Sequence, residues 1–199
     1  IRRPCSVAAD PPESFGNLDS REDAETRGNW LGVYGADGYV LPGGGDGGAD
    51  RLSLPEYVAS VTFHRCDRIV WAQGTADDRA PAAPGGASGL SGPRTAAAVC
   101  TKDPTATYQT MYADIILAKE RQFELALYFV DWDGTSRRLA VELIDAATLK
   151  QIAPVRVVKD FHRGKYVVYG VDRSVRVRIN TIRKPNAVLS GLFFASDDR

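Results

Sequence analysis

Apolar and polar residues alternate with a period of two in several segments of this chain. Segments of this kind, each with one apolar face, lie at 59–63, 111–117, 123–129, 139–143 and 175–179. Such alternation is typical of β-strands that bury one face and expose the other to water. The segments are short and closely spaced, and helical periodicity is rare between them. The pattern therefore predicts an all-β fold, an antiparallel β-sandwich of about eight or more strands.

The last apolar segment, residues 187–194, is apolar at nearly every position. It reads Ala-Val-Leu-Ser-Gly-Leu-Phe-Phe, which is apolar enough for a central strand. Earlier in the chain, turn-forming residues at 133–136 separate two alternating segments. They predict a hairpin over residues 123–144, with Asp131 and Trp132 at its tip.

Three segments are poor in large apolar side chains and are expected to be loops. Residues 1–14 contain three prolines and are interpreted as a flexible N-terminal segment or linker, so a single β-sandwich domain is expected over 15–199. Residues 43–50 are almost pure glycine and aspartate, and residues 79–98 are mostly Ala, Gly, Pro and Ser. Such segments offer little to bury against the entropy cost of ordering a chain. Both are therefore predicted to be long, flexible loops inserted into the sandwich.

Residues 28–41 form the most distinctive segment, with four glycines, one Trp and two Tyr. Glycine permits turns that other residues resist, and large aromatic rings need a surface to pack against or a ligand to stack on. Two roles are therefore open: the segment caps an end of the sandwich, or its rings hold the C–H face of a sugar. We expect Trp30 to cap the core, and Tyr34, Tyr39 and the more exposed Trp132 to contact ligand.

Asp131 and Asp133 are the candidates for a metal site. Two carboxylates two residues apart in a turn could begin a calcium loop, but the further acidic residues of an EF-hand are missing. The other interpretation is a turn in which the aspartates accept backbone N–H groups and pair with an arginine. Arg137 and Arg138 follow closely, and Arg137 is a candidate ligand-binding residue. No cofactor besides this calcium is indicated.

Charge is unevenly placed along the chain, although the net charge is zero. Residues 10–50 hold nine acidic residues against two basic ones, whereas residues 154–184 hold nine basic residues against two acidic ones. Within the basic stretch, Arg176 and Arg178 alternate with apolar residues, so both are expected on one wet face. Guanidinium groups suit carboxylates and sulfates. The stretch predicts an anionic polymer or the acidic segment of another protein as partner, the alternative being a solvated face.

Other function classes have little support in the sequence. Zero net charge gives no overall field toward nucleic acid or a membrane, and no apolar run reaches the ~18 residues of a membrane-spanning helix. His64 and His162 lie in no nucleophile-type turn, so the chain is not expected to be an enzyme. Cys5, Cys66 and Cys100 form an odd set without metal-ligand spacing. One disulfide, with Cys66–Cys100 the first pair to test, or three thiols are both open.

Four segments together resemble a known family. They are 15–19, 28–39, 125–133 continuing into 141–148, and 186–194. Their order and spacing resemble the carbohydrate-binding-module-like β-sandwich domain appended to secreted bacterial glycoside hydrolases and other exported proteins. The resemblance implies a galactose-binding-like jelly roll in an extracellular or cell-surface setting. It carries over no ligand-contacting residue.

The resemblance and the residues together favour a non-catalytic, glycan-binding accessory module. Its partner would be a polysaccharide or other glycan, neutral or anionic. The alternative is a structural or assembly domain of an extracellular polymer or large complex, in which copies of the chain or neighbouring domains dock through the acidic and basic stretches. The candidate ligand-binding residues are Trp132, Tyr34, Tyr39, Arg137, Arg176 and Arg178.

Overall fold

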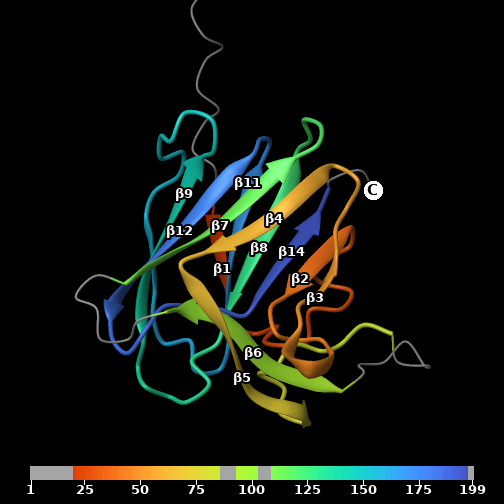
Figure 1. Cartoon of the computed structure of the whole chain (residues 1–199), viewed down its shortest axis with the longest axis vertical. Helices are drawn as coiled ribbons and strands as arrows, with labels where there is room; N and C mark the ends of the chain where they lie inside the picture. Colours follow the sequence, from red (N-terminus) through yellow and green to blue (C-terminus); the bar gives the residue numbers. More distant parts are fainter. Residues whose placement is uncertain (1–19, 86–92, 103–108, 197–199) are drawn as a thin grey trace, which may run out of the picture.

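Figure 1 shows the computed structural model of the chain, which describes residues 20–85, 93–102 and 109–196. In these ranges fourteen strands form three antiparallel sheets, which confirms an all-β fold consistent with a β-sandwich. Within these three ranges the one helical element is a 3-10 turn, η1 (Asp46–Gly48), and none of their segments is a helix able to cross a membrane. The predictions for residues 1–14, 15–19 and Cys5 lie outside the described residues.

Two large sheets overlie each other and form the body of the sandwich (Figure 1). The six-stranded sheet has the order β1 (Ser20–Asp23), β11 (Lys165–Val171), β8 (Phe123–Phe129), β14 (Gly191–Ala195), β2 (Gly38–Leu41), β3 (Arg51–Ser53). The five-stranded sheet has the order β10 (Arg156–Val158), β9 (Arg138–Asp145), β12 (Val175–Arg183), β7 (Thr110–Leu117), β4 (Val58–His64). A smaller sheet at the lower end of the view consists of β13 (Val188–Leu189), β6 (Arg94–Thr101), β5 (Cys66–Thr75).

The inward-facing side chains of both large sheets meet in one core. Leu127 of β8, Leu143 of β9 and Val177 of β12 are fully buried in the same apolar cluster. Val99 of β6 and Leu189 of β13 join this cluster, so the small sheet closes one end of the core. β14 lies between β8 and β2, which confirms the central strand predicted within the last apolar segment.

The hairpin predicted over residues 123–144 is wrong. β8 belongs to the six-stranded sheet, between β11 and β14, whereas β9 belongs to the five-stranded sheet, between β10 and β12. The segment 130–137 therefore crosses from one sheet to the other. An alternating pattern fixes which face of a strand is buried but not which strand it pairs with, so it could not distinguish a hairpin from this crossover.

The loop predicted at 79–98 is also wrong in part. Residues 94–98 belong to β6, which pairs with β5, and Ala80 and Ala82 before it are buried. Consecutive small residues such as alanine are alike in size and polarity, so a strand made of them shows no alternation of apolar and polar positions. Residues 86–92 lie outside the described residues. The other predicted loop, residues 43–50, is compact, and within it the N–H of Gly45 donates to the Ala49 carbonyl at 2.8 Å.

The first part of the aromatic segment, residues 28–37, acts as a cap, but it covers a sheet face and not an end of the sandwich, and residues 38–41 form β2 of that sheet. Trp30 is 2% exposed, and its indole N–H donates to the Ala82 carbonyl at 2.8 Å. It packs in a second apolar cluster against Tyr128 of β8, Tyr166 of β11 and Phe193 of β14. These three side chains point away from the main core, so the central strands of the six-stranded sheet are buried on both faces.

Cys66 and Cys100 are both free thiols. The pairing of β5 with β6 places Cys66 opposite Thr101 and Cys100 opposite Asp67. Residues one position apart in register point to opposite faces of a sheet, which is why the Cys66–Cys100 disulfide is not formed. Burial raises the pKa of both thiols.

Candidate functional site

The six predicted ligand-binding residues lie in three separate regions and do not form one site. Two are in the cap over the six-stranded sheet or in β2 beneath it, two are on the outer face of the five-stranded sheet, and two are in the crossover 130–137: Tyr34 and Tyr39, Arg176 and Arg178, Trp132 and Arg137. In the first two regions the side chains are largely engaged within the protein. The third region borders a pocket.

Tyr34 is occupied on its ring and on its hydroxyl. It is 4% exposed, and its ring stacks on Tyr166 with the two centroids 4.4 Å apart. The hydroxyl donates to Asp23 Oδ2 at 2.8 Å and accepts from Arg21 at 3.1 Å. Burial and the hydrogen bond to Asp23 raise the pKa of Tyr34 to about 12. Tyr39 is half-buried, and its ring centroid lies 5.0 Å from that of Trp30. The contacts of both tyrosines favour a capping role over ligand binding.

Arg176 and Arg178 share the wet face of β12, as predicted, but both are already ion-paired. Arg176 donates to both carboxylate oxygens of Asp114, at 2.6 and 2.7 Å. Arg178 does the same with Glu142 on β9, where its Nε donates at 3.0 Å. The hydrogen bond from Arg176 holds the pKa of Asp114 below its usual range. These bonds occupy much of the donor capacity that an anionic partner would need.

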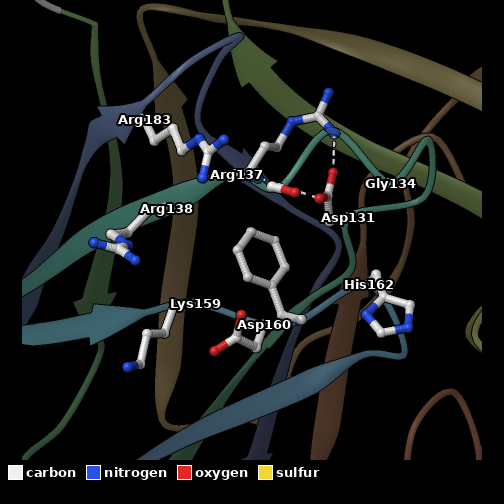
Figure 2. Close-up of a pocket in the computed structure, with 10 residues that line it drawn as sticks. Asp131, Gly134, Arg137, Arg138, Lys159, Asp160, His162 and Arg183 are labelled. Carbon is white, nitrogen blue, oxygen red and sulfur yellow. Dashed lines mark hydrogen bonds and ion pairs between the residues drawn. The ribbon is translucent and has the colours of Figure 1, made fainter.

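A pocket of about 320 Å³ opens beside the crossover, at the start of β9 and the end of β12. Its walls come from the crossover, from the segment after β10 and from the end of β12. The lining residues are Asp131, Gly134, Ser136, Arg137, Arg138, Lys159, Asp160, Phe161, His162 and Arg183. Figure 2 shows Arg183, Arg138 and Lys159 along one side, His162 on the other and Asp160 between them.

An irregularity in β12 brings two of these arginines together. Thr181 pairs with Leu139 and Arg183 with Arg138, so Ile182 is an extra residue, a β-bulge. Strict alternation would place Arg183 on the inward side of β12 together with Ile179. Because directly opposed residues share a face, the bulge places Arg183 on the face of Arg138. Bulges often re-aim a side chain next to a functional site.

Three cations of this pocket, Arg138, Lys159 and Arg183, have no counter-ion among the residues that the structure describes. Arg138, Lys159 and Arg183 are exposed, and none makes an ion pair or a side-chain hydrogen bond with any described residue. Like charges directly opposed on neighbouring strands destabilise a sheet. Folding thus places three positive charges around one hollow without neutralising them. An anion that enters the hollow would supply the missing partner.

One arginine of the pocket differs, because it is buried and fully paired. The side chain of Arg137 is 2% exposed and contacts the carboxylates of Asp131 and Asp133. Its Nε donates to Asn186 Oδ1 at 3.0 Å, which ties the crossover to the segment before β13. Burial alone would lower the pKa of Arg137, but the hydrogen bonds to the two aspartates outweigh it and raise the pKa. Arg137 therefore positions the crossover and has little capacity left for a ligand.

The same pair of aspartates bears on the calcium prediction. Asp131 also accepts hydrogen bonds from the backbone N–H groups of Thr135 and Arg137, at 3.3 and 3.2 Å. This is the arginine-paired turn that was the alternative interpretation. Calcium would have to displace the guanidinium group of Arg137, and no cluster of three potential metal ligands occurs in the described ranges. Calcium binding stays an untested prediction.

Two residues that line the pocket have a backbone conformation unusual for their type. Ser136 has φ +60° and Asp160 has φ +55°, both in the left-handed region. Only a few per cent of non-glycine residues occur there, and such conformations cluster at functional sites. Ser136 directly precedes Arg137, and Asp160 directly follows Lys159. The unusual turns therefore help to set the shape of the pocket wall.

Trp132 lies beside the pocket but does not line it. The guanidinium group of Arg79 covers the indole, 4.3 Å from the ring centroid. Arg79 also donates to the carbonyls of Trp132 and His162, at 3.3 and 3.2 Å. Arg79 thus links two walls of the pocket, and Trp132 is partly buried under it. The indole is therefore less available to a ligand than the predicted hairpin tip suggested.

The pocket residues that sequence reasoning missed are Ser136, Arg138, Asp160 and His162. Lys159 and Arg183 were counted only as members of the basic stretch, 24 residues apart in the chain. The one local signal was the pair Arg137 and Arg138 directly after a turn. Their assembly depends on the bulge and on the crossover between sheets, which have no signature in the chain.

No family model matches the chain, and no curated protein matches it.

Proposed function

We propose that this chain is a non-catalytic module that binds acidic glycans through the pocket formed by Arg138, Lys159 and Arg183. The observation that carries the proposal is the set of three cations around one hollow, none of which has a partner among the described residues. Charge-assisted hydrogen bonds from arginine to carboxylate or sulfate groups are among the stronger polar contacts. The module is proposed as the accessory domain of a secreted or cell-surface protein, with a galactose-binding-like jelly roll.

The size of the pocket suits a glycan better than a bare ion. A volume of about 320 Å³ is at the lower end of ordinary ligand pockets, and it accommodates a sugar ring with its acidic substituent. Ser136 and Asp160 also line it, and neither side chain has a hydrogen-bond partner among the described residues. Their oxygens can accept hydrogen bonds from sugar hydroxyls. The three cations would thus hold the acidic group, and Ser136 and Asp160 beside them would hold ring hydroxyls.

The test is calorimetric titration of the protein with uronic-acid and sulfated oligosaccharides. The variants Arg138→Gln and Arg183→Gln are each expected to lower affinity roughly tenfold, or ~1.4 kcal/mol. Lys159→Gln should act in the same direction, while Lys119→Gln is its matched control. Lys119 is exposed in the turn before β8, at the opposite end of that strand from the crossover.

Two results would overturn the proposal. One is unchanged affinity in both arginine variants, and the other is an equal loss in Lys119→Gln, which would indicate a general charge effect. Binding at the pocket should also weaken as salt rises from about 0.05 M to about 0.5 M, because screening shortens the range of charge interactions.

The assembly role has less support from the geometry. It required acidic residues of one copy to meet basic residues of another, but several acidic residues in the described part of the acidic stretch are engaged within their own chain. Asp50 pairs with Arg68, Glu22 pairs with Lys165, and Asp23 accepts from Tyr34. Sedimentation at increasing concentration tests this alternative: a salt-sensitive dimer that Arg183→Gln abolishes would favour it over the glycan module.

A further inference from the structure

We propose that the group bound in this pocket is doubly charged, a phosphate monoester on a sugar. This inference rests on the proposed glycan-binding function and names the chemistry of the ligand. A phosphate monoester carries a charge of about −1.5 to −2 near pH 7, with three acceptor oxygens. A sulfate monoester or a uronate carries a single negative charge.

The charge of the pocket points to the dianion. Of the charged lining residues, Asp131 and Arg137 form a buried pair and neutralise each other. The remaining ones are Arg138, Lys159 and Arg183 against Asp160, a net charge of +2 before any contribution from His162. Asp133 also contacts Arg137, but it does not line the pocket. A singly charged group would leave one of these cations without a counter-ion.

The placement of donors supports a tetrahedral group with several acceptors. Arg138 and Arg183 face each other across two paired strands, and Figure 2 shows Lys159 following on the same side of the pocket. Two planar guanidinium groups and one ammonium group line the pocket from three separate backbone positions. Three phosphate oxygens can each accept from a different cation, whereas a carboxylate has only two oxygens to share.

The experiment compares two probes with the same ring, glucose 6-phosphate and glucose 6-sulfate, at about pH 7.5 and about pH 5. At the higher pH we expect the phosphate to bind roughly tenfold more tightly than the sulfate. At the lower pH, below the second phosphate pKa of about 6, the preference should largely disappear, because both esters then carry one charge.

Protein groups that face the ligand also respond to pH and need their own control. The titratable and charged side chains around the pocket are Asp131, Arg137, Arg138, Lys159, Asp160, His162 and Arg183. Histidine side chains change charge between about pH 5 and 8, so the measurements are repeated with His162→Asn. A change in the protein shifts both esters together, whereas a change in the ligand shifts only the phosphate. Lys159→Gln should reduce the phosphate preference at the higher pH, and Lys119→Gln should leave it intact.

The outcomes separate the two proposals. Equal affinity for both esters at the higher pH would overturn the dianion inference and leave acidic-glycan binding standing. If neither ester binds and no acidic oligosaccharide binds, both the dianion inference and the acidic-glycan function are overturned. Inorganic phosphate is the third probe: if it binds as tightly as the sugar phosphate, the ring is not recognised and the glycan function fails. A preference that persists at the lower pH in His162→Asn would also contradict the dianion.

Discussion

β9 and β12 carry two sets of facing side chains on one hydrogen-bonded ladder, and the two sets differ in how their charge is balanced. In the middle of the ladder Arg178 faces Glu142 and is ion-paired with it. At the end of the ladder Arg183 faces Arg138, and neither has a carboxylate partner among the described residues. The number of arginines in a stretch therefore does not measure its capacity for anions. What matters is how many of them the fold has left unpaired.

The largest expected effect on stability comes from the buried, fully paired arginine next to these two. Arg137→Met should lower the free energy of unfolding by about 3–5 kcal/mol, because it leaves Asp131 as a buried charge without its partner. Urea denaturation measures the loss. The control is Asp133→Asn, which alters the exposed end of the same cluster and should cost less than ~1 kcal/mol. A similarly small loss of unfolding free energy in both variants would mean that Arg137 does not stabilise the crossover.

Arg178→Gln tests the paired side of the comparison. It should lower the free energy of unfolding by about 1–2 kcal/mol, since Glu142 is 8% exposed and would lose its charged partner. Binding of acidic glycans should stay within about twofold of the wild type, because this arginine does not line the pocket. A loss of affinity as large as that of Arg183→Gln would make the β12 face a ligand surface after all.

The paired arginines should also make stability depend on pH. Hydrogen bonds from Arg176 and Arg137 lower the pKa of Asp114 and Asp133 below that of an unfolded-chain aspartate, about 3.9. Each ion pair therefore contributes stability that is present above about pH 4 and lost as pH falls through the lower, folded-state pKa. Arg176→Gln should reduce this acid sensitivity in urea denaturation between about pH 2 and pH 6, whereas Arg183→Gln should leave it unchanged. If stability depends on pH in the same way in both variants, the paired and unpaired arginines do not differ in this respect.

The smallest effect on stability is expected at the unpaired arginine. Arg183→Gln should change the free energy of unfolding by no more than about 0.5 kcal/mol, with any gain due to relief of the repulsion with Arg138. Thermal denaturation in low salt is the measurement, with Arg178→Gln as the matched variant. A loss above ~1.5 kcal/mol would show that Arg183 has a structural role and not one reserved for a ligand.

Much of the fold could be predicted from the sequence because burial follows local alternation. The inward rows at Leu125 and Leu127, Val141 and Leu143, and Val175 and Val177 are all fully buried, as their spacing indicated. Strand pairing is a long-range property, so the crossover between β8 and β9 was mistaken for a hairpin. The alanine-rich part of β6 was missed because its side chains are too similar in size to show a period.

The candidate site was harder to predict, because charge balance depends on pairing. Arg176 and Arg183 belong to the same basic stretch, yet one faces Asp114 and the other faces Arg138. A single extra residue, Ile182, decides on which face Arg183 lies. Neither the partner of Arg176 nor this bulge could be inferred from neighbouring residues in the chain.

The crossover and the bulge also make the pocket a sensitive reporter of the native state. Its walls come from residues 131–138, 159–162 and 183, which are far apart in the chain and meet only in the folded structure. A ligand that needs all three walls binds the native chain and not the unfolded one, so occupancy raises the melting temperature by mass action. At a concentration one hundred times its dissociation constant, such a ligand adds about 2.7 kcal/mol of stability. A thermal-shift screen of acidic sugars can therefore identify the ligand without attaching a label to the protein or to the sugar.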